Sequence, residues 1–259
     1  MNPLLAAASL VLAMFVSMIL FMEIGRRIGV AGLAREPDGQ PKGIGPSEGA
    51  IFGLLGLVIA FTFSGAAGRF EDRRDLITEE ANNIGTAWLR IDLLPAEAQP
   101  GMRDLFRRYL DARLETYKLV HDETAKNLKI AESTALQEEI WKTTVGNMHK
   151  PGAAGSAPML LPQALNAMID ITTTRMVATR NHPPQVIFLL LPVLILIGAM
   201  LVGFNMAANK HRQWMHMTAF AAVMSLVVYV IIDIEFPRLG LIRVDTADIV
   251  LIELRQSMK

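Results

Sequence analysis

The chain lacks cysteine, a net charge and the common catalytic motifs. Without cysteine, its 259 residues hold no disulfide, no thiolate metal site and no cysteine nucleophile. Its 25 basic residues balance its 25 acidic ones, so no strong field favours nucleic acid or an acidic substrate as a partner. Phosphate-binding glycine loops and the HExxH and GxSxG motifs are missing, and the histidines are scattered without ligand spacing. We therefore expect no enzyme activity, no cofactor and no bound metal.

Apolar residues, in contrast, make up 52% of the chain and gather in four long runs. The runs cover 4–22, 49–67, 186–204 and 217–234. Each is long enough to cross about 30 Å of hydrocarbon as a helix. No basic residue precedes the first run, Arg26 and Arg27 follow it, and no small-residue cleavage site closes it, which favours a retained span over a signal peptide. The sequence predicts a multi-pass integral membrane protein in contact with the lipid bilayer.

The segment between the second and third runs is predicted to form a helical domain outside the membrane. Its apolar residues, such as Leu105, Tyr109 and Leu110, recur at spacings of three and four, which is typical of helices. The expected fold is therefore an all-α integral membrane protein with four transmembrane helices. Its expected parts are 1–68 (two spans and their loop), 69–183 (helical extramembrane domain), 184–238 (two spans) and 239–259 (C-terminal tail).

The second apolar run continues into charged sequence without a proline between Gly49 and Trp88. We therefore expect one long helix that crosses the membrane and extends into the helical domain. Successive residues of an α-helix lie about 100° apart around its axis. On this spacing, small residues inside the membrane and polar residues beyond it fall on one face of the helix, within a sector of about 80°. This small/polar stripe consists of Gly53, Gly56, Ala60, Ser64, Glu71, Arg74, Thr78 and Asn82.

Two interpretations of the small/polar stripe remain open. Small residues in membrane helices commonly allow a neighbouring helix to approach closely, and this interpretation is the more frequent one. The alternative is a water-filled path, in which small and hydroxyl side chains leave room for an ion and apolar rings gate by dewetting. Four spans rarely enclose such a path alone, so the second interpretation requires a symmetric homo-oligomer.

A second face of the long helix carries a seam of large apolar residues. Its members are Phe52, Ile59, Phe63, Phe70, Ile77, Ile84 and Ile91, the last five at a strict spacing of seven. A sustained seven-residue spacing predicts packing against another helix in the manner of a coiled coil.

A membrane-boundary charge cluster follows the last span, in the sequence IIDIEFPRLGLIRVD. It consists of Asp233, Glu235, Arg238 and Arg243. Acidic residues at the edge of the hydrocarbon are costly unless they face water or a cation. The cluster is interpreted either as an ion-binding or selectivity ring or as a structural group of salt bridges, and the second is favoured. Arg69, Arg73 and Arg74 below the second span are further candidate partners.

The sequences EGAIFGLLGLVIAFTFSGAAGRFEDRRDLITEEANNIGTAWLRIDLLP and DIEFPRLGLIRVD resemble the bacterial bestrophin-like family. The resemblance covers nearly the whole chain and implies a relation to bestrophins, which are homopentameric channels, chiefly for anions such as chloride. It implies a pore lined by the second membrane helix, with an apolar neck for which Phe52, Ile59 and Phe63 are the candidate positions, in a bacterial inner membrane. No acidic run after the last span resembles the calcium clasp of animal bestrophins, so calcium activation is not implied.

The expected function is therefore a homo-oligomeric ion channel, pentameric by the resemblance, whose partners are lipid, ions and other copies of itself. The rival interpretation is a non-conducting membrane scaffold or sensor whose helical domain binds a partner. The rival predicts that the small/polar stripe is packed against the chain's own other spans.

Overall fold

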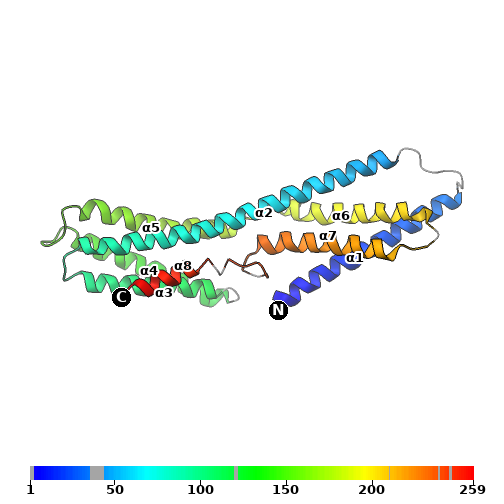
Figure 1. Cartoon of the computed structure of the whole chain (residues 1–259). Coiled ribbons are helices and arrows are strands. Elements are labelled where there is room, and N and C mark those ends of the chain that lie inside the picture. The colour runs from blue at the N-terminus through cyan, green and yellow to red at the C-terminus, as the bar shows by residue number, and fades with distance from the viewer. Residues whose placement is uncertain (1–2, 36–43, 120–121, 210, 239, 245–246) are drawn as a thin grey trace. The chain divides into compact units, whose positions relative to one another are not determined.

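The computed structural model describes residues 3–35, 44–119, 122–209, 211–238, 240–244 and 247–259. Within those residues the secondary structure is helical, without strands, which confirms the predicted all-α fold (Figure 1). The chain divides into two compact units. The membrane unit comprises Met1–Arg69 and His182–Ile242, and the helical unit comprises Phe70–Asn181 and Arg243–Lys259. Helix α2 (Ile44–Leu89) is continuous from one unit into the other, as the proline-free sequence predicts.

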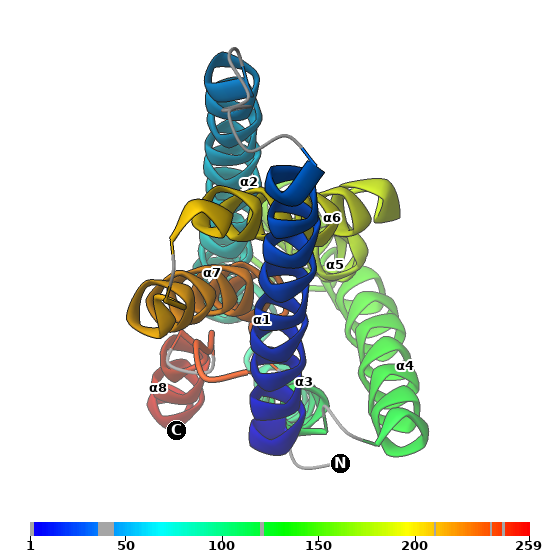
Figure 2. The same cartoon turned by 90° about the vertical axis from the view of Figure 1, so that its right-hand side faces the viewer.

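The membrane unit is built on α1 (Pro3–Arg35), which packs against both α6 (Gln185–Asn205) and α7 (Trp214–Glu235) (Figure 2). A short 3₁₀ turn, η2 (Met206–Ala208), follows α6. Helices α1 and α6 approach so closely that a Cβ on Gly25 would collide with the backbone of Met200, and one on Gly203 with that of Met22. Glycine is needed at both positions because the two backbones nearly touch, as in other close membrane-helix pairs.

Four stretches of the described chain are long and apolar enough to cross a membrane. They are Leu5–Arg35, Gly45–Leu93, Ala157–Ala208 and Trp214–Glu235, and each corresponds to one of the predicted apolar runs. The third stretch includes α5 (Ala157–Arg180) of the helical unit, and its apolar part is α6. The prediction of four membrane spans is confirmed.

The helical unit consists of the outer part of α2, the 3₁₀ turn η1 (Arg90–Leu93), α3 (Gln99–Lys118), α4 (Glu123–Asn147), α5 and α8 (Ile249–Ser257). Helix α3 packs against α4 and α8, and α5 packs against η1 and α4. Asp122 caps the start of α4, and its carboxylate accepts a hydrogen bond of 2.9 Å from the backbone N–H of Ala125. Ile77, Ile84 and Ile91 are fully buried in the core of this unit, so this part of the apolar seam is packed, whereas Phe63 of the same seam is 45% exposed. The coiled-coil manner of packing stays a prediction.

Helix α8 was not predicted from the sequence. It lies in the segment 239–259, which we expected as a tail, and its Leu251 is fully buried in the core of the helical unit. The guanidinium of Arg255 donates two hydrogen bonds, of 2.8 and 2.9 Å, to the carboxylate of Asp111 on α3. The end of the chain is therefore held in the helical unit by apolar contact and by an ion pair.

Candidate functional site

The small/polar stripe of α2 is exposed along its whole length in the subunit. Every one of its eight residues, from Gly53 to Asn82, is exposed to solvent or lipid. A Cβ built on Gly53 or Gly56 would meet no described atom within 4 Å. In the polar half, Arg74 and Glu71 form an ion pair of 3.1 Å with each other. The described spans of the same chain therefore leave this face of α2 uncovered.

The three candidate neck residues have different surroundings. Phe52 and Ile59 pack against the apolar core of their own membrane unit. The ring of Phe52 lies 3.3 Å from the position that a Cβ on Gly198 of α6 would take. Phe63 is 45% exposed. On the 3.6-residue period its side chain lies at the edge of the small/polar stripe, whereas Phe52 and Ile59 point further toward the rest of the subunit.

Glu235, at the end of α7, is completely buried, and its described partners include Arg69 and His182. Arg69 of α2 donates hydrogen bonds of 3.1, 3.0 and 2.6 Å to both of its carboxylate oxygens. The Nδ1 atom of His182 lies 2.8 Å from its Oε1, and the imidazole stacks on Phe236 with ring centroids 4.7 Å apart. Burial of this carboxylate is tolerated because both oxygens are bound by charged or polar partners.

Asp233, two residues earlier, organises the turn that follows α7. Its carboxylate accepts backbone N–H bonds from Leu241, at 2.9 and 3.1 Å, and from Ile242, at 2.7 Å. Tyr229 also donates its hydroxyl to this group, at 3.0 Å. A side chain on Gly240 would collide with the Asp233 carboxylate, so the glycine lets the turn close over it.

The two arginines assigned to the boundary cluster belong to different units. Arg238 is half-buried in the membrane unit, and Arg243 is exposed in the helical unit. Of the further candidate partners, Arg69 binds Glu235, while Arg73 donates hydrogen bonds of 3.1 Å to the carbonyls of Ala178 and Asn181 at the end of α5. His182 was missed from the sequence, because nothing in its local pattern marks it as a carboxylate partner.

A buried charge network that sequence reasoning did not identify lies in the helical unit. Glu80 of α2 is completely buried and binds Arg113 of α3, at 2.7 Å, and Arg175 of α5. Tyr117 donates its hydroxyl to Glu80 at 2.8 Å, and its ring lies under the guanidinium of Arg175, 4.1 Å from the ring centroid. Asp248 lies 4.0 Å from the far side of Arg175.

The electrostatics of this network favour the ionised state of Glu80. Burial alone raises the pKa of its carboxyl, but the charges of Arg113 and Arg175 outweigh burial and hold the pKa below its ordinary value. Burial and the negative charge of Glu80 raise the pKa of the Tyr117 hydroxyl. The network therefore consists of an ionised carboxylate, two guanidinium groups and a neutral phenol, and it fixes the outer part of α2 to α3 and α5.

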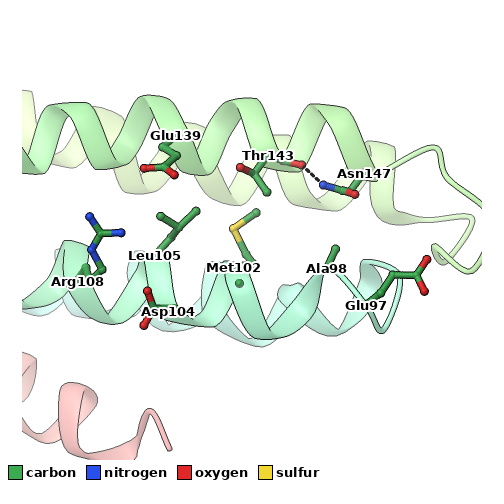
Figure 3. Close-up of a pocket in the computed structure, with 10 residues that line it drawn as sticks. Glu97, Ala98, Met102, Asp104, Leu105, Arg108, Glu139, Thr143 and Asn147 are labelled. Carbon is green, nitrogen blue, oxygen red and sulfur yellow. Dashed lines mark hydrogen bonds between the residues drawn. The ribbon is translucent and has the colours of Figure 1, made fainter.

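A shallow groove of about 470 Å³ lies between α3 and α4 (Figure 3). Met102 and Leu105 supply its apolar wall, while Arg108, Glu139 and other polar residues line it. Within the described part of the chain, no group of three or more His, Asp or Glu side chains is arranged to hold a metal ion. The features with the clearest relation to a membrane function are therefore the exposed stripe of α2 and the charge cluster at its exit from the membrane.

The fold and these features define the class of the protein as a multi-pass helical membrane protein with a helical extramembrane unit. A family model described as the bestrophin-like domain matches residues 32–249, and the chain belongs to that family. The resemblance predicted from the two sequence motifs is thereby confirmed. Comparisons with curated proteins and with solved structures found no match.

Proposed function

We propose that the protein assembles as a closed homo-oligomeric ring, a pentamer by its family resemblance, and conducts ions along a central path lined by α2. The family resemblance further suggests anion selectivity, with chloride as the first candidate ion, and a bacterial cytoplasmic membrane as the location. The proposal concerns transport and requires no covalent chemistry from the protein.

The observation that carries this proposal is the uncovered small/polar stripe of α2. Its other marked face, the apolar seam, contacts the chain's own cores through Phe52, Ile77 and Ile84. A helix that is held by its own subunit on one face and exposes small and polar residues on another is suited to line a shared path. The scaffold interpretation expects the stripe to pack against the chain's own spans, and such packing is not found among the described residues.

The proposed path has an apolar part and a polar part. At the membrane level, exposed Phe63 stands beside the small residues Ala60 and Ser64, where rings from several subunits can narrow the path and gate it by dewetting. Phe52 and Ile59 support this region from the subunit side. Beyond the membrane the stripe presents Glu71, Arg74, Thr78 and Asn82, which form the wall of a polar vestibule in this proposal.

The buried contacts of α2 supply the rigidity that a pore-lining helix needs. Arg69 binds Glu235 where the helix leaves the membrane, and Glu80 binds Arg113 and Arg175 further out. Both ion pairs are on the subunit side of α2, so they hold the stripe toward the outside of the subunit. Their buried geometry is consistent with a positioning role rather than with ion conduction.

The proposal is tested by recording from the purified protein in planar bilayers under a chloride gradient. An anion channel gives a current whose reversal potential moves toward the chloride equilibrium potential. A current that reverses at the equilibrium potential of the cation would support an ion channel and contradict anion selectivity. The absence of any current from an intact oligomer would favour the scaffold interpretation.

A further inference from the structure

Glu48, near the start of α2, is a buried carboxylate with one oxygen that has no hydrogen-bond partner among the described residues. It is 9% exposed, and its Oε2 accepts a hydrogen bond of 2.7 Å from the side-chain amide of Asn205. Its Oε1 is buried and has no hydrogen-bond partner among the described residues. A buried carboxylate oxygen without a partner carries a desolvation cost that a bound cation or a proton relieves.

The partner of Glu48 lies at the negative end of a helix. Asn205 is the last residue of α6, and the C-terminal end of a helix carries a partial negative charge. Helix α6 contains no charged side chain of its own. The Glu48 carboxylate and the end of α6 therefore place two sources of negative potential next to each other, and this combination attracts a cation.

The basic side chains of this region bind other oxygen atoms. Arg27 and Arg212 both pair with Glu23, at 3.1 and 3.0 Å. Arg26 directs Nη2 to the carbonyl of Asn209, at 3.5 Å, while its buried Nε, like Oε1 of Glu48, has no hydrogen-bond partner among the described residues. None of these contacts places a basic side chain on the Oε1 atom of Glu48.

We propose that Glu48 and Asn205 form a binding site for a monovalent metal cation, Na⁺ or K⁺, between α2 and α6. A single carboxylate matches one positive charge, whereas Ca²⁺ and Mg²⁺ sites commonly draw on more oxygen ligands and more negative charge. The amide of Asn205 supplies an oxygen as well as its N–H donors, and it turns to present that oxygen to a cation.

The cation joins α2 to its own subunit. Glu48 lies on the same side of α2 as Phe52 and Leu55, which meet Gly198 of α6 two turns further along. It therefore faces the subunit rather than the small/polar stripe. A cation at this site strengthens the contact between α2 and α6 without occupying the proposed ion path.

The site is tested by thermal unfolding of the purified protein in detergent, in sodium, potassium or choline chloride of equal concentration. At a concentration about ten times the dissociation constant, Na⁺ or K⁺ should raise the Tm by about 3 °C above its value in choline chloride. The reason is that a ligand that binds only the folded state stabilises that state. Glu48→Gln should abolish this difference. Glu79→Gln, which makes the same change at an exposed position on the same helix, should retain it.

The possible outcomes distinguish a cation from a proton at Glu48, and they distinguish the cation site from the proposed channel. An equal Tm of the wild type in all three salts, or an equal response from Glu48→Gln, overturns the cation site. A Glu48→Gln protein that is more stable than the wild type and insensitive to cations identifies a proton as the occupant, which also overturns it. If Glu48→Gln does not fold, saturable binding of radioactive sodium to the wild type, one ion per chain, decides. None of these measurements requires ion conduction, so they test the cation site independently of the proposed channel.

Discussion

At the scale of single residues, Glu80 combines an ionised side chain with complete burial. Its carboxylate is completely buried, and it is compensated by Arg113 and Arg175 from two other helices. Removing one partner of a buried ion pair leaves an uncompensated charge, whereas the intact group roughly balances its own desolvation. The network therefore matters more for holding α2 in one position than for adding net stability.

Glu80→Gln should lower the free energy of unfolding by about 3–5 kcal/mol, because two buried guanidinium groups lose their counter-charge. Chemical or thermal unfolding of the purified protein measures this change. Glu79→Gln, at the exposed neighbouring position, should change stability by less than about 0.5 kcal/mol. Equal effects of the two variants would contradict the network.

The depressed pKa of Glu80 also predicts how stability depends on pH. A carboxyl whose pKa is lower in the folded state contributes stability that is present above its unfolded pKa, about 4.3, and is lost as the pH falls through its folded pKa. The wild type should therefore lose stability on acidification below about pH 4. Glu80→Gln should show a smaller loss, measured as Tm against pH, and parallel curves for the two proteins would exclude Glu80 as the cause.

Phe63 is the residue on which the proposed gate depends most. Phe63→Ala should raise the single-channel current or the open probability several-fold, because a smaller apolar side chain keeps the constriction wet. Phe52→Ala is the matched control, since Phe52 packs against its own subunit. It should lower stability, with little effect on the current of the channels that remain, and unchanged currents in both variants would reject the neck.

At the scale of elements, α2 shows what the sequence can and cannot predict. Its continuity and its buried isoleucines follow from local periodicity and from the absence of proline. Periodicity also places the small and polar residues on one face, but it left open whether that face is packed or exposed. The partners of Glu80 do not follow from such patterns, because they are brought close by the packing of helices far apart in the chain. For Glu235, the sequence indicated Arg69 as a candidate partner, and it did not indicate His182. Helix α8 was missed for a similar reason: it is short, and its burial depends on contact with α3.

The native chain contains no cysteine, so single cysteines can report the surroundings of each face of α2. Ser64→Cys, on the exposed stripe, should react with a charged, water-soluble thiol reagent, and the reaction should reduce the current. Leu55→Cys, buried on the opposite side of the same helix, should neither react nor change the current. Reaction of Leu55→Cys together with an inert Ser64→Cys would contradict the assignment of the two faces.

At the scale of the whole molecule, the protein is a multi-pass membrane protein of the bestrophin-like family whose second membrane helix continues into a helical extramembrane unit. The described residues of one chain leave the small/polar stripe of that helix uncovered. A closed ring of identical chains brings these stripes together around one axis. The proposed conduction therefore depends on assembly.

The most direct test of this account is the mass of the purified complex by native mass spectrometry in detergent. The account predicts a single closed assembly of several 28.5 kDa chains, five by the family resemblance. A protein that is only a monomer or a dimer would contradict it, because too few copies of α2 would be present to enclose a path.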